Sequence, residues 1–291
     1  MSKTTVVTAL FDIGRDKLDG RTWDEYLDWF SRTLQLNCPM VVFVEEKTKD
    51  FVLKHRGDKP TKVITQKLED VPFYKNKKEI ERVISLPKYK HAMRDSDRIE
   101  CNSSLYTIIQ YSKFGWMKDA CDSNWFDSEI FIWMDAGLCR FFVTNGPLGG
   151  TPLFDITKKF PTDKFETDMK KFEGTPVFEK RTHHYIDLYS APMIGNEYFF
   201  DSRSIIAGGI WCGDKEAVEK IHNEVDHIFT EALKQNMLNN EQILLGWCMI
   251  NKRLPETIKY NPWEMNAGKF SMNNTFDNFV NYRMIEIMGE E

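Results

Sequence analysis

Short apolar runs that alternate with amphipathic segments are the feature that most constrains the fold of this chain. Residues 5–10, 40–44 and 129–134 are rich in β-branched and apolar side chains and hold too few polar residues for a half-exposed strand. Such runs are typical of strands buried on both faces of a sheet. The segments between them are long enough for crossover helices. The pattern therefore predicts an α/β fold with a mainly parallel central sheet and helices on both faces.

Helix signals fall between these strands. Thr22 and Glu25 have the spacing of a capping box and precede an apolar stripe, so a helix is predicted to begin there. Residues 103–120 predict a long helix, residues 47–55 a weaker helix, and residues 62–65 a third strand. Residues 67–100 are charged and contain two prolines. They are predicted to form an insertion with one short helix.

The second half of the chain is less regular. Residues 154–181 predict a solvated loop with a short helix, and residues 185–189 and 204–210 predict strands. Asp214 is a predicted helix cap. Another helix is predicted to start near Asn239, where Asn239 and Gln242 resemble a capping box. The aromatic tail after Pro255 is predicted to be irregular and to wrap the domain.

Length, charge and cysteine usage exclude several classes of protein. The 291 residues are treated as one domain, and the formal net charge of −5 gives no general attraction to nucleic-acid phosphates. No signal peptide is recognised, and no window approaches the roughly 18 apolar residues of a membrane span. The six cysteines are scattered without a C-x-x-C pair, which favours reduced thiols and a cytoplasmic protein. Peripheral membrane contact stays compatible with the sequence.

Carboxylates follow two of the predicted strands. Asp12 comes after the first strand and Asp135 after the run at 131–134. If these strands are parallel neighbours, both carboxylates lie at the edge of the sheet where α/β proteins bind ligands. A carboxylate there can hold Mg²⁺ or Mn²⁺, and Gly137 would let the backbone approach a ligand. The alternative for Asp135 is an ordinary strand-end turn or helix cap.

Three further features have both a functional and a purely structural interpretation. Lys113 falls within the apolar arc of its helix, so it either extends to the helix edge or pairs with an anion such as Asp135. The adjacent glycines Gly208 and Gly209 mark close approach to a ligand or a tight bulge. Glu241 either belongs to a helix start or points at a substrate. Dinucleotide and phosphate-loop fingerprints are absent from the sequence, as is a serine-hydrolase elbow.

Five segments together resemble a known family. VVTALFDIGR at 6–15, YSKFGWMKDA at 111–120, FIWMDAG at 131–137, AGGIWCG at 207–213 and NNEQILL at 239–245 follow the order seen in bacterial HtrL/YibB-like proteins. That family looks like a GT-A glycosyltransferase. The resemblance covers residues 4–250 in outline. It implies a GT-A-like, Rossmann-type three-layer sandwich, with a nucleotide-binding half at about 1–150 and an acceptor-side half at about 151–291.

The resemblance also implies roles for particular residues. Asp135 matches one carboxylate of the metal-binding Asp-x-Asp signature, but Gly137 stands where the second Asp is expected. Glu241 looks like the acidic residue near the reacting centre and is the candidate catalytic base, with Asp135 as metal ligand. The residues implied to lie near the nucleotide sugar are Thr8, Ala9, Phe11, Asp12, Arg15, Lys113, Gly137, Gly208 and Gly209.

The function implied is transfer of a sugar from a UDP- or GDP-sugar to a hydroxyl of a glycan or another acceptor, assisted by Mn²⁺ or Mg²⁺. Whether the reaction inverts or retains the anomeric centre is left open. A sugar nucleotidyltransferase ranks lower, because the loop after the first strand carries only Gly14 and Arg15. A non-catalytic carbohydrate- or nucleotide-binding protein of the same fold is the other alternative, and Gly137 is its best support.

Overall fold

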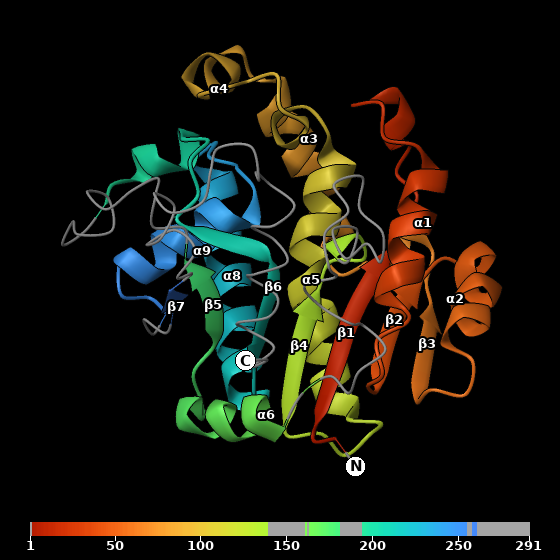
Figure 1. Cartoon of the computed structure of the whole chain (residues 1–291). Helices are drawn as coiled ribbons and strands as arrows, with labels where there is room; N and C mark the ends of the chain where they lie inside the picture. The colour runs from red at the N-terminus through yellow and green to blue at the C-terminus, as the bar shows by residue number, and fades with distance from the viewer. Residues whose placement is uncertain (1, 139–160, 162, 181–193, 255–257, 261–291) are drawn as a thin grey trace, which may run out of the picture.

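A computed structural model describes residues 2–138, 161, 163–180, 194–254 and 258–260. These residues form a seven-stranded sheet with the order β3-β2-β1-β4-β6-β5-β7 (Figure 1). Strand β6 is antiparallel to its neighbours β4 and β5, and the other pairings are parallel. The strands are β1 (Thr4–Leu10), β2 (Met40–Val44), β3 (Thr61–Thr65), β4 (Ile130–Met134), β5 (Val177–Lys180), β6 (Ile206–Gly213) and β7 (Ile258–Tyr260).

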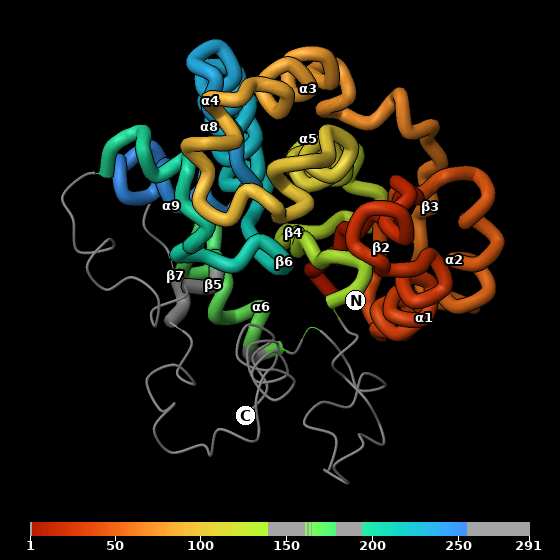
Figure 2. Tube along the Cα trace, turned by 90° about the horizontal axis from the view of Figure 1, so that it is seen from above, coloured from red at the N-terminus to blue at the C-terminus, as the bar shows by residue number. Residues whose placement is uncertain are grey.

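Helices cover both faces of the sheet. Viewed from above, α3, α4, α5, α8 and α9 lie on one side, and α1 and α6 lie on the other (Figure 2). Helix α2 packs on the same side as α1. The bounds are α1 (Trp23–Thr33), α2 (Lys49–Arg56), α3 (Lys77–Ser85), α4 (Pro87–Ala92), α5 (Ser104–Ser123), α6 (Asp163–Met169), α8 (Lys215–Lys234) and α9 (Glu241–Ile250). The predicted three-layer α/β architecture is confirmed.

Alternation along the strands explains why the central strands lack exposed polar residues. In β1, Val7 and Ala9 join the core under α5, whereas Val6 and Leu10 join the core under α1. Successive side chains of a strand point to opposite faces, so a strand covered on both faces must be apolar throughout. All five residues of β4 are buried for the same reason.

The local capping signals mostly predicted the helix starts. Thr22 and Glu25 form the expected capping box, and Asp214 accepts a hydrogen bond from Ala217 N at the start of α8. The capping box predicted for Asn239 and Gln242 is wrong, because Asn240 is the N-cap of α9 and accepts from Ile243 N.

Two predictions for the charged segments need correction. The segment 67–100 contains two α-helices, α3 and α4, rather than one. Pro87 is the first residue of α4, a position that proline tolerates in a helix. The segment 154–181 contains a strand, β5, in addition to the short helix α6. The predicted strand at 185–189 and most of the tail after Pro255 lie outside the described residues.

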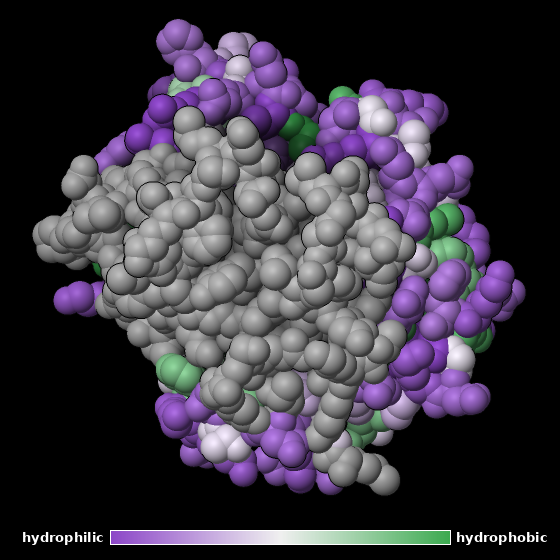
Figure 3. Space-filling model, in the orientation of Figure 1, coloured by the Kyte–Doolittle hydropathy of each residue, from purple (hydrophilic) through white to green (hydrophobic). Residues whose placement is uncertain are grey.

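Little of the described surface is apolar. The coloured residues in Figure 3 are mainly hydrophilic, and the large hydrophobic side chains exposed among the described residues are Leu18, Leu53 and Trp125. None of the described helices combines the length and the hydropathy needed to cross a bilayer. The parallel strands β1 and β4 end side by side at one edge of the sheet, which is where α/β proteins bind ligands.

Candidate active site

A cavity of about 300 Å³ opens at the carboxyl ends of β1 and β4. Its walls come from the segment after β1, from α1, from one face of α5, from the residues after β4 and from β6. This is the edge predicted from Asp12 and Asp135. The side chains and backbone that line it include Ala9, Phe11, Asp12, Arg15, Arg21, Trp23, Tyr26, Tyr106, Gln110, Lys113, Trp133, Asp135, Gly137, Gly209 and Gln242.

Lys113 connects the cavity to the protein interior. Its Nζ donates to Glu241 Oε1 at 2.8 Å, to the carbonyl of Gly208 at 3.1 Å and to Asp135 Oδ1 at 3.4 Å. The residue is only 3% exposed, so its side chain does not extend along the helix to solvent. The alternative in which Lys113 pairs with a carboxylate such as Asp135 is therefore confirmed.

The charges around Lys113 keep it protonated. Burial lowers the pKa of Lys113, but the carboxylates of Asp135 and Glu241 outweigh burial and hold the pKa above its usual value. The ammonium group also lies 5.6 Å from the centre of the Trp133 ring. At neutral pH this group is a fixed cation on the wall of the cavity.

Asp135 is held by its surroundings at one oxygen only. Its backbone N–H donates to the carbonyl of Gly209 at 2.9 Å, and Trp133 Nε1 donates to Oδ1 at 2.7 Å. The other oxygen, Oδ2, has no hydrogen-bonding partner among the described residues. The side chain is 49% exposed, so Oδ2 is the oxygen with which Asp135 can bind a ligand.

Glu241 lies beneath this wall rather than on it. The residue is 2% exposed and is not among those that line the cavity. Its Oε1 accepts from Lys113, whereas Oε2 is buried without a hydrogen-bonding partner in the described part of the chain. Burial raises the pKa of Glu241, and Lys113 offsets part of that rise. This position does not suit a base that must touch an acceptor hydroxyl, contrary to the expectation from sequence.

The glycine pair forms a bulge in β6. The register of β6 against β5 shifts between Phe178, which pairs with Trp211, and Glu179, which pairs with Ala207, so residues 208–210 lie at the irregularity. A Cβ at position 208 would clash with Glu241 Oε1, so the packing of the protein itself requires Gly208. A Cβ at position 209 would lie 3.3 Å from Asp135 Oδ2. Gly209 therefore keeps the cavity open beside the free oxygen of Asp135.

The predicted residues of the first strand divide between the cavity and the core. Ala9, Phe11, Asp12 and Arg15 line the cavity. Thr8 does not, because it is fully buried and lies two residues before the end of β1 at Leu10.

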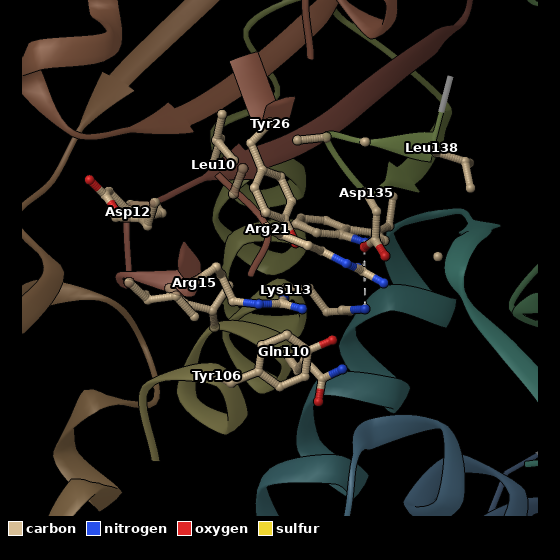
Figure 4. A pocket seen from close by; sticks show the side chains of 18 of the residues that line it. Leu10, Asp12, Arg15, Arg21, Tyr26, Tyr106, Gln110, Lys113, Asp135 and Leu138 are labelled. Carbon is tan, nitrogen blue, oxygen red and sulfur yellow. Dashed lines mark hydrogen bonds and ion pairs between the residues drawn. The ribbon is translucent and has the colours of Figure 1, made fainter. Parts of the chain in front are cut away.

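Asp12 lines the cavity, but its carboxylate points outward, away from Lys113 and Asp135 (Figure 4). Oδ2 accepts from Lys47 Nζ at 3.0 Å. Burial raises the pKa of Asp12, and its hydrogen bonds with Lys47 and the backbone of Gly14 outweigh burial and lower the pKa overall. Asp12 therefore shares the edge with Asp135 without forming a carboxylate pair.

Sequence reasoning missed several residues of the cavity. Tyr106, Gln110 and Lys113 lie at helical spacing on one face of α5, and all three line the cavity. That spacing could have extended the prediction from Lys113 to its neighbours. Arg21 and Tyr26 were also missed, because their approach to the cavity depends on the path of the loop between β1 and α1.

The relatives of this chain agree with the sequence resemblance. A family described as "Bacterial protein of unknown function (HtrL_YibB)" matches residues 2–270. The chain belongs to this HtrL_YibB family. Protein HtrL from Escherichia coli (strain K12) is 27% identical to it over 262 residues, which are 85% of this chain and 84% of that protein.

Two solved structures are also similar to this HtrL_YibB chain. The apo form of mouse xyloside xylosyltransferase 1 matches with a TM-score of 0.42 and 10% identity, covering 88% of this chain and 84% of that chain. Core-mannan synthase A from Aspergillus fumigatus in its Mn/GDP form matches with a TM-score of 0.46 and 9% identity, covering 89% and 73%. A likeness at this level says nothing by itself about the reaction of this chain.

Proposed function

We propose that this protein is a glycosyltransferase that moves a sugar from a nucleoside-diphosphate donor to a hydroxyl of a glycan or another acceptor. The observation that carries the proposal is the composition of one cavity at the carboxyl ends of β1 and β4. It combines aromatic rings, three cationic side chains and the half-exposed carboxylate of Asp135. The sequence resemblance to the HtrL/YibB-like proteins, the family to which the chain belongs, implies the same interpretation.

Each group of residues suits one part of such a donor. The rings of Trp23, Tyr26 and Tyr106 offer surfaces on which a nucleobase can stack. Arg15, Arg21 and Lys113 supply positive charge for a diphosphate. A nucleoside or a sugar without phosphate would use only part of these groups. We therefore assign the cavity to the whole nucleotide rather than to a carbohydrate alone.

A divalent cation fits the free oxygen of Asp135. Mg²⁺ is commonly held by one or two carboxylates together with substrate phosphates and water, so one protein oxygen is compatible with a metal site. No group of three acidic, histidine or cysteine side chains that could hold a metal occurs in the described ranges. Mn²⁺ or Mg²⁺ would therefore be held by Asp135 and the diphosphate jointly, and it would supply charge neutralisation for the leaving group.

The residues of the chain would act on the departing diphosphate. During transfer, the bond between the anomeric carbon and the diphosphate oxygen breaks and a bond to the acceptor oxygen forms, while the proton of the acceptor hydroxyl passes to the departing diphosphate or to water. Lys113 and Arg15 would stabilise the negative charge that collects on the diphosphate. We assign Glu241 to the positioning of Lys113, because its carboxylate is buried below the cavity.

The direct test is a donor-hydrolysis screen across common UDP- and GDP-sugars with Mn²⁺ and with Mg²⁺, combined with thermal unfolding in UDP and GDP. We expect at least one nucleotide to raise the melting temperature and the matching donor to be hydrolysed slowly. Binding without turnover of any donor would favour the non-catalytic alternative. Formation of a nucleotide sugar from a nucleoside triphosphate and a sugar phosphate would favour the nucleotidyltransferase. No binding of any nucleotide would contradict the proposal.

A further inference from the structure

The loop between β1 and α1 folds back on itself and brings two arginines to one carboxylate. It contains the short 3-10 helix Arg15–Lys17 and is flanked by two glycines in the left-handed region, Gly14 with φ 70° and Gly20 with φ 80°. Asp19 lies between the turns. Its carboxylate pairs with Arg15 and lies 3.7 Å from Nε of Arg21.

Arg15 is held rigidly in this loop. Its Nε donates to Asp19 Oδ1 at 2.9 Å, and Nη2 donates to Oδ2 of the same carboxylate. Its guanidinium carbon lies 4.5 Å from the centre of the Tyr106 ring and 5.7 Å from that of Tyr26. The side chain is 10% exposed, and Nη1 has no hydrogen-bonding partner among the described residues. Nη1 is thus a preorganised donor on the cavity wall.

Arg21 is held more loosely. Its side chain is 47% exposed, and its Nε lies 3.7 Å from Asp19 Oδ2, which is longer than a hydrogen bond. In Figure 4 the side chains of Arg15, Arg21 and Lys113 extend into the same part of the cavity. Arg21 can therefore adjust to a ligand that Arg15 already faces.

The charges of the loop favour an anionic ligand. Residues 15–21 contain three basic side chains, Arg15, Lys17 and Arg21, and two acidic ones, Asp16 and Asp19, which gives a net charge of +1. Both guanidinium groups share the one carboxylate of Asp19, so neither can be fully neutralised by it. On the opposite wall, Lys113 is already matched by Asp135 and Glu241. The loop therefore carries more unmatched positive charge than the wall that holds Lys113.

We propose that Arg15 and Arg21 form a clamp that grips the diphosphate of the donor, with Asp19 as the residue that positions both. The ligand class is a diphosphate ester, since two separate guanidinium groups match two phosphates better than one. The clamp rests on the proposed function for its natural ligand. Its chemistry, however, requires only a diphosphate.

The test is calorimetric titration of the full chain at fixed Mg²⁺ with UDP, UMP, GDP, GMP and inorganic pyrophosphate. Arg21→Gln is expected to weaken binding of the diphosphates by about tenfold, and binding of the monophosphates by a smaller factor. Arg82→Gln is the control outside the cavity, because Arg82 is 42% exposed and pairs with Glu79 on α3, and its other donors bind Asn236 Oδ1 and the carbonyl of Leu233. Equal affinities of the Arg21 and Arg82 variants for diphosphates would overturn the clamp.

Asp19→Asn separates positioning from simple charge. If Asp19 only opposes the ligand, removing its charge strengthens diphosphate binding. If it positions Arg15 and Arg21, the loss of the bidentate pair weakens binding, and we expect a loss of about threefold or more. Stronger binding by this variant would overturn the positioning role.

The clamp and the proposed function can fail separately. Pyrophosphate binding that Arg21→Gln weakens, with no binding of UDP or GDP, would support the clamp and contradict the function. Nucleotide binding that is insensitive to Arg21→Gln would leave the function and overturn the clamp. No binding of pyrophosphate or of any nucleotide by the unsubstituted protein would overturn both.

Discussion

Two buried cations, Arg56 and Lys113, show how differently this fold treats internal positive charge. Arg56 ends α2 and is fully buried on the face of the sheet that carries α1. Its guanidinium donates to Thr61 Oγ1 and to four backbone carbonyls, those of Leu34, Leu36, Cys38 and Pro60, at distances from 2.5 to 3.2 Å. Lys113 is equally buried on the other face, but it meets two carboxylates and lines a cavity.

The pKa directions of the two groups follow from these partners. Burial lowers the pKa of Arg56, since its partners are mainly neutral carbonyls, whereas Asp135 and Glu241 raise the pKa of Lys113. Arg56 uses its donors to join the end of α1 to the start of β3, which is structural work. Lys113 is placed where its charge can act on a ligand. A buried cation marks a site when it has ionised partners and a cavity, and not through burial alone.

Lys113→Met is expected to have the largest effect. It leaves Glu241 buried without its cation, so the free energy of unfolding should fall by about 3–5 kcal/mol, and nucleotide affinity should fall by about a hundredfold. Urea unfolding and calorimetry measure the two losses. Lys118→Met, on the exposed side of the same helix, is the control. Unchanged nucleotide affinity in Lys113→Met would mean that Lys113, like Arg56, has only a structural role.

Arg56→Met is expected to affect stability alone. The carbonyls that Arg56 joins would be left without donors, which should lower the free energy of unfolding by about 3 kcal/mol. Nucleotide affinity of the folded fraction should equal that of the unsubstituted protein. A large loss of affinity at a temperature where the variant is folded would show that Arg56 also supports the cavity.

A double variant tests whether Lys113 and Glu241 stabilise the protein as a pair. Adding Glu241→Gln to Lys113→Met removes the unpaired buried carboxylate, so about 1–2 kcal/mol of stability should return without recovery of nucleotide binding. Chemical unfolding of the two single variants and the double variant gives the coupling energy. Additive losses would mean that Lys113 and Glu241 do not act as a unit.

Gly209→Ala should produce the smallest effect. The added methyl would lie 3.3 Å from Asp135 Oδ2, so it should crowd the free oxygen with a stability change below about 1 kcal/mol. Nucleotide affinity should fall by a few-fold. A variant that binds nucleotides as tightly as the unsubstituted protein would mean that Oδ2 does not contact the ligand.

Much of the architecture of residues 2–138 could be predicted because its signals are local. The strand at 40–44 was placed with its observed bounds, and its core position follows from an unbroken apolar run. Lys113 was singled out from its place on an apolar helix face, and its partner Asp135 was correctly named.

Other features depend on contacts distant in sequence. Charged residues flank strand β5 in the sequence. Only its pairing with the distant strands β6 and β7 shows that it belongs to the sheet. Asn239 and Asn240 are equivalent as caps in sequence. The structure selects Asn240 because Asn239 uses its side-chain amide to bind the carbonyls of Phe199 and Asp201. The approach of Arg21 to Asp19 likewise follows from the path of a glycine-flanked loop.

Calorimetric titration of UDP or GDP with and without Mn²⁺, in the unsubstituted protein and in Asp135→Asn, tests the proposed nucleotide site at Asp135 most directly. Asparagine keeps the shape of the side chain but removes the charge that would hold a cation. We expect Mn²⁺ to increase the affinity of the unsubstituted protein for UDP or GDP, and Asp135→Asn to lose that increase while unfolding at a similar temperature. The same Mn²⁺ dependence in both proteins would contradict a metal-dependent nucleotide site at Asp135.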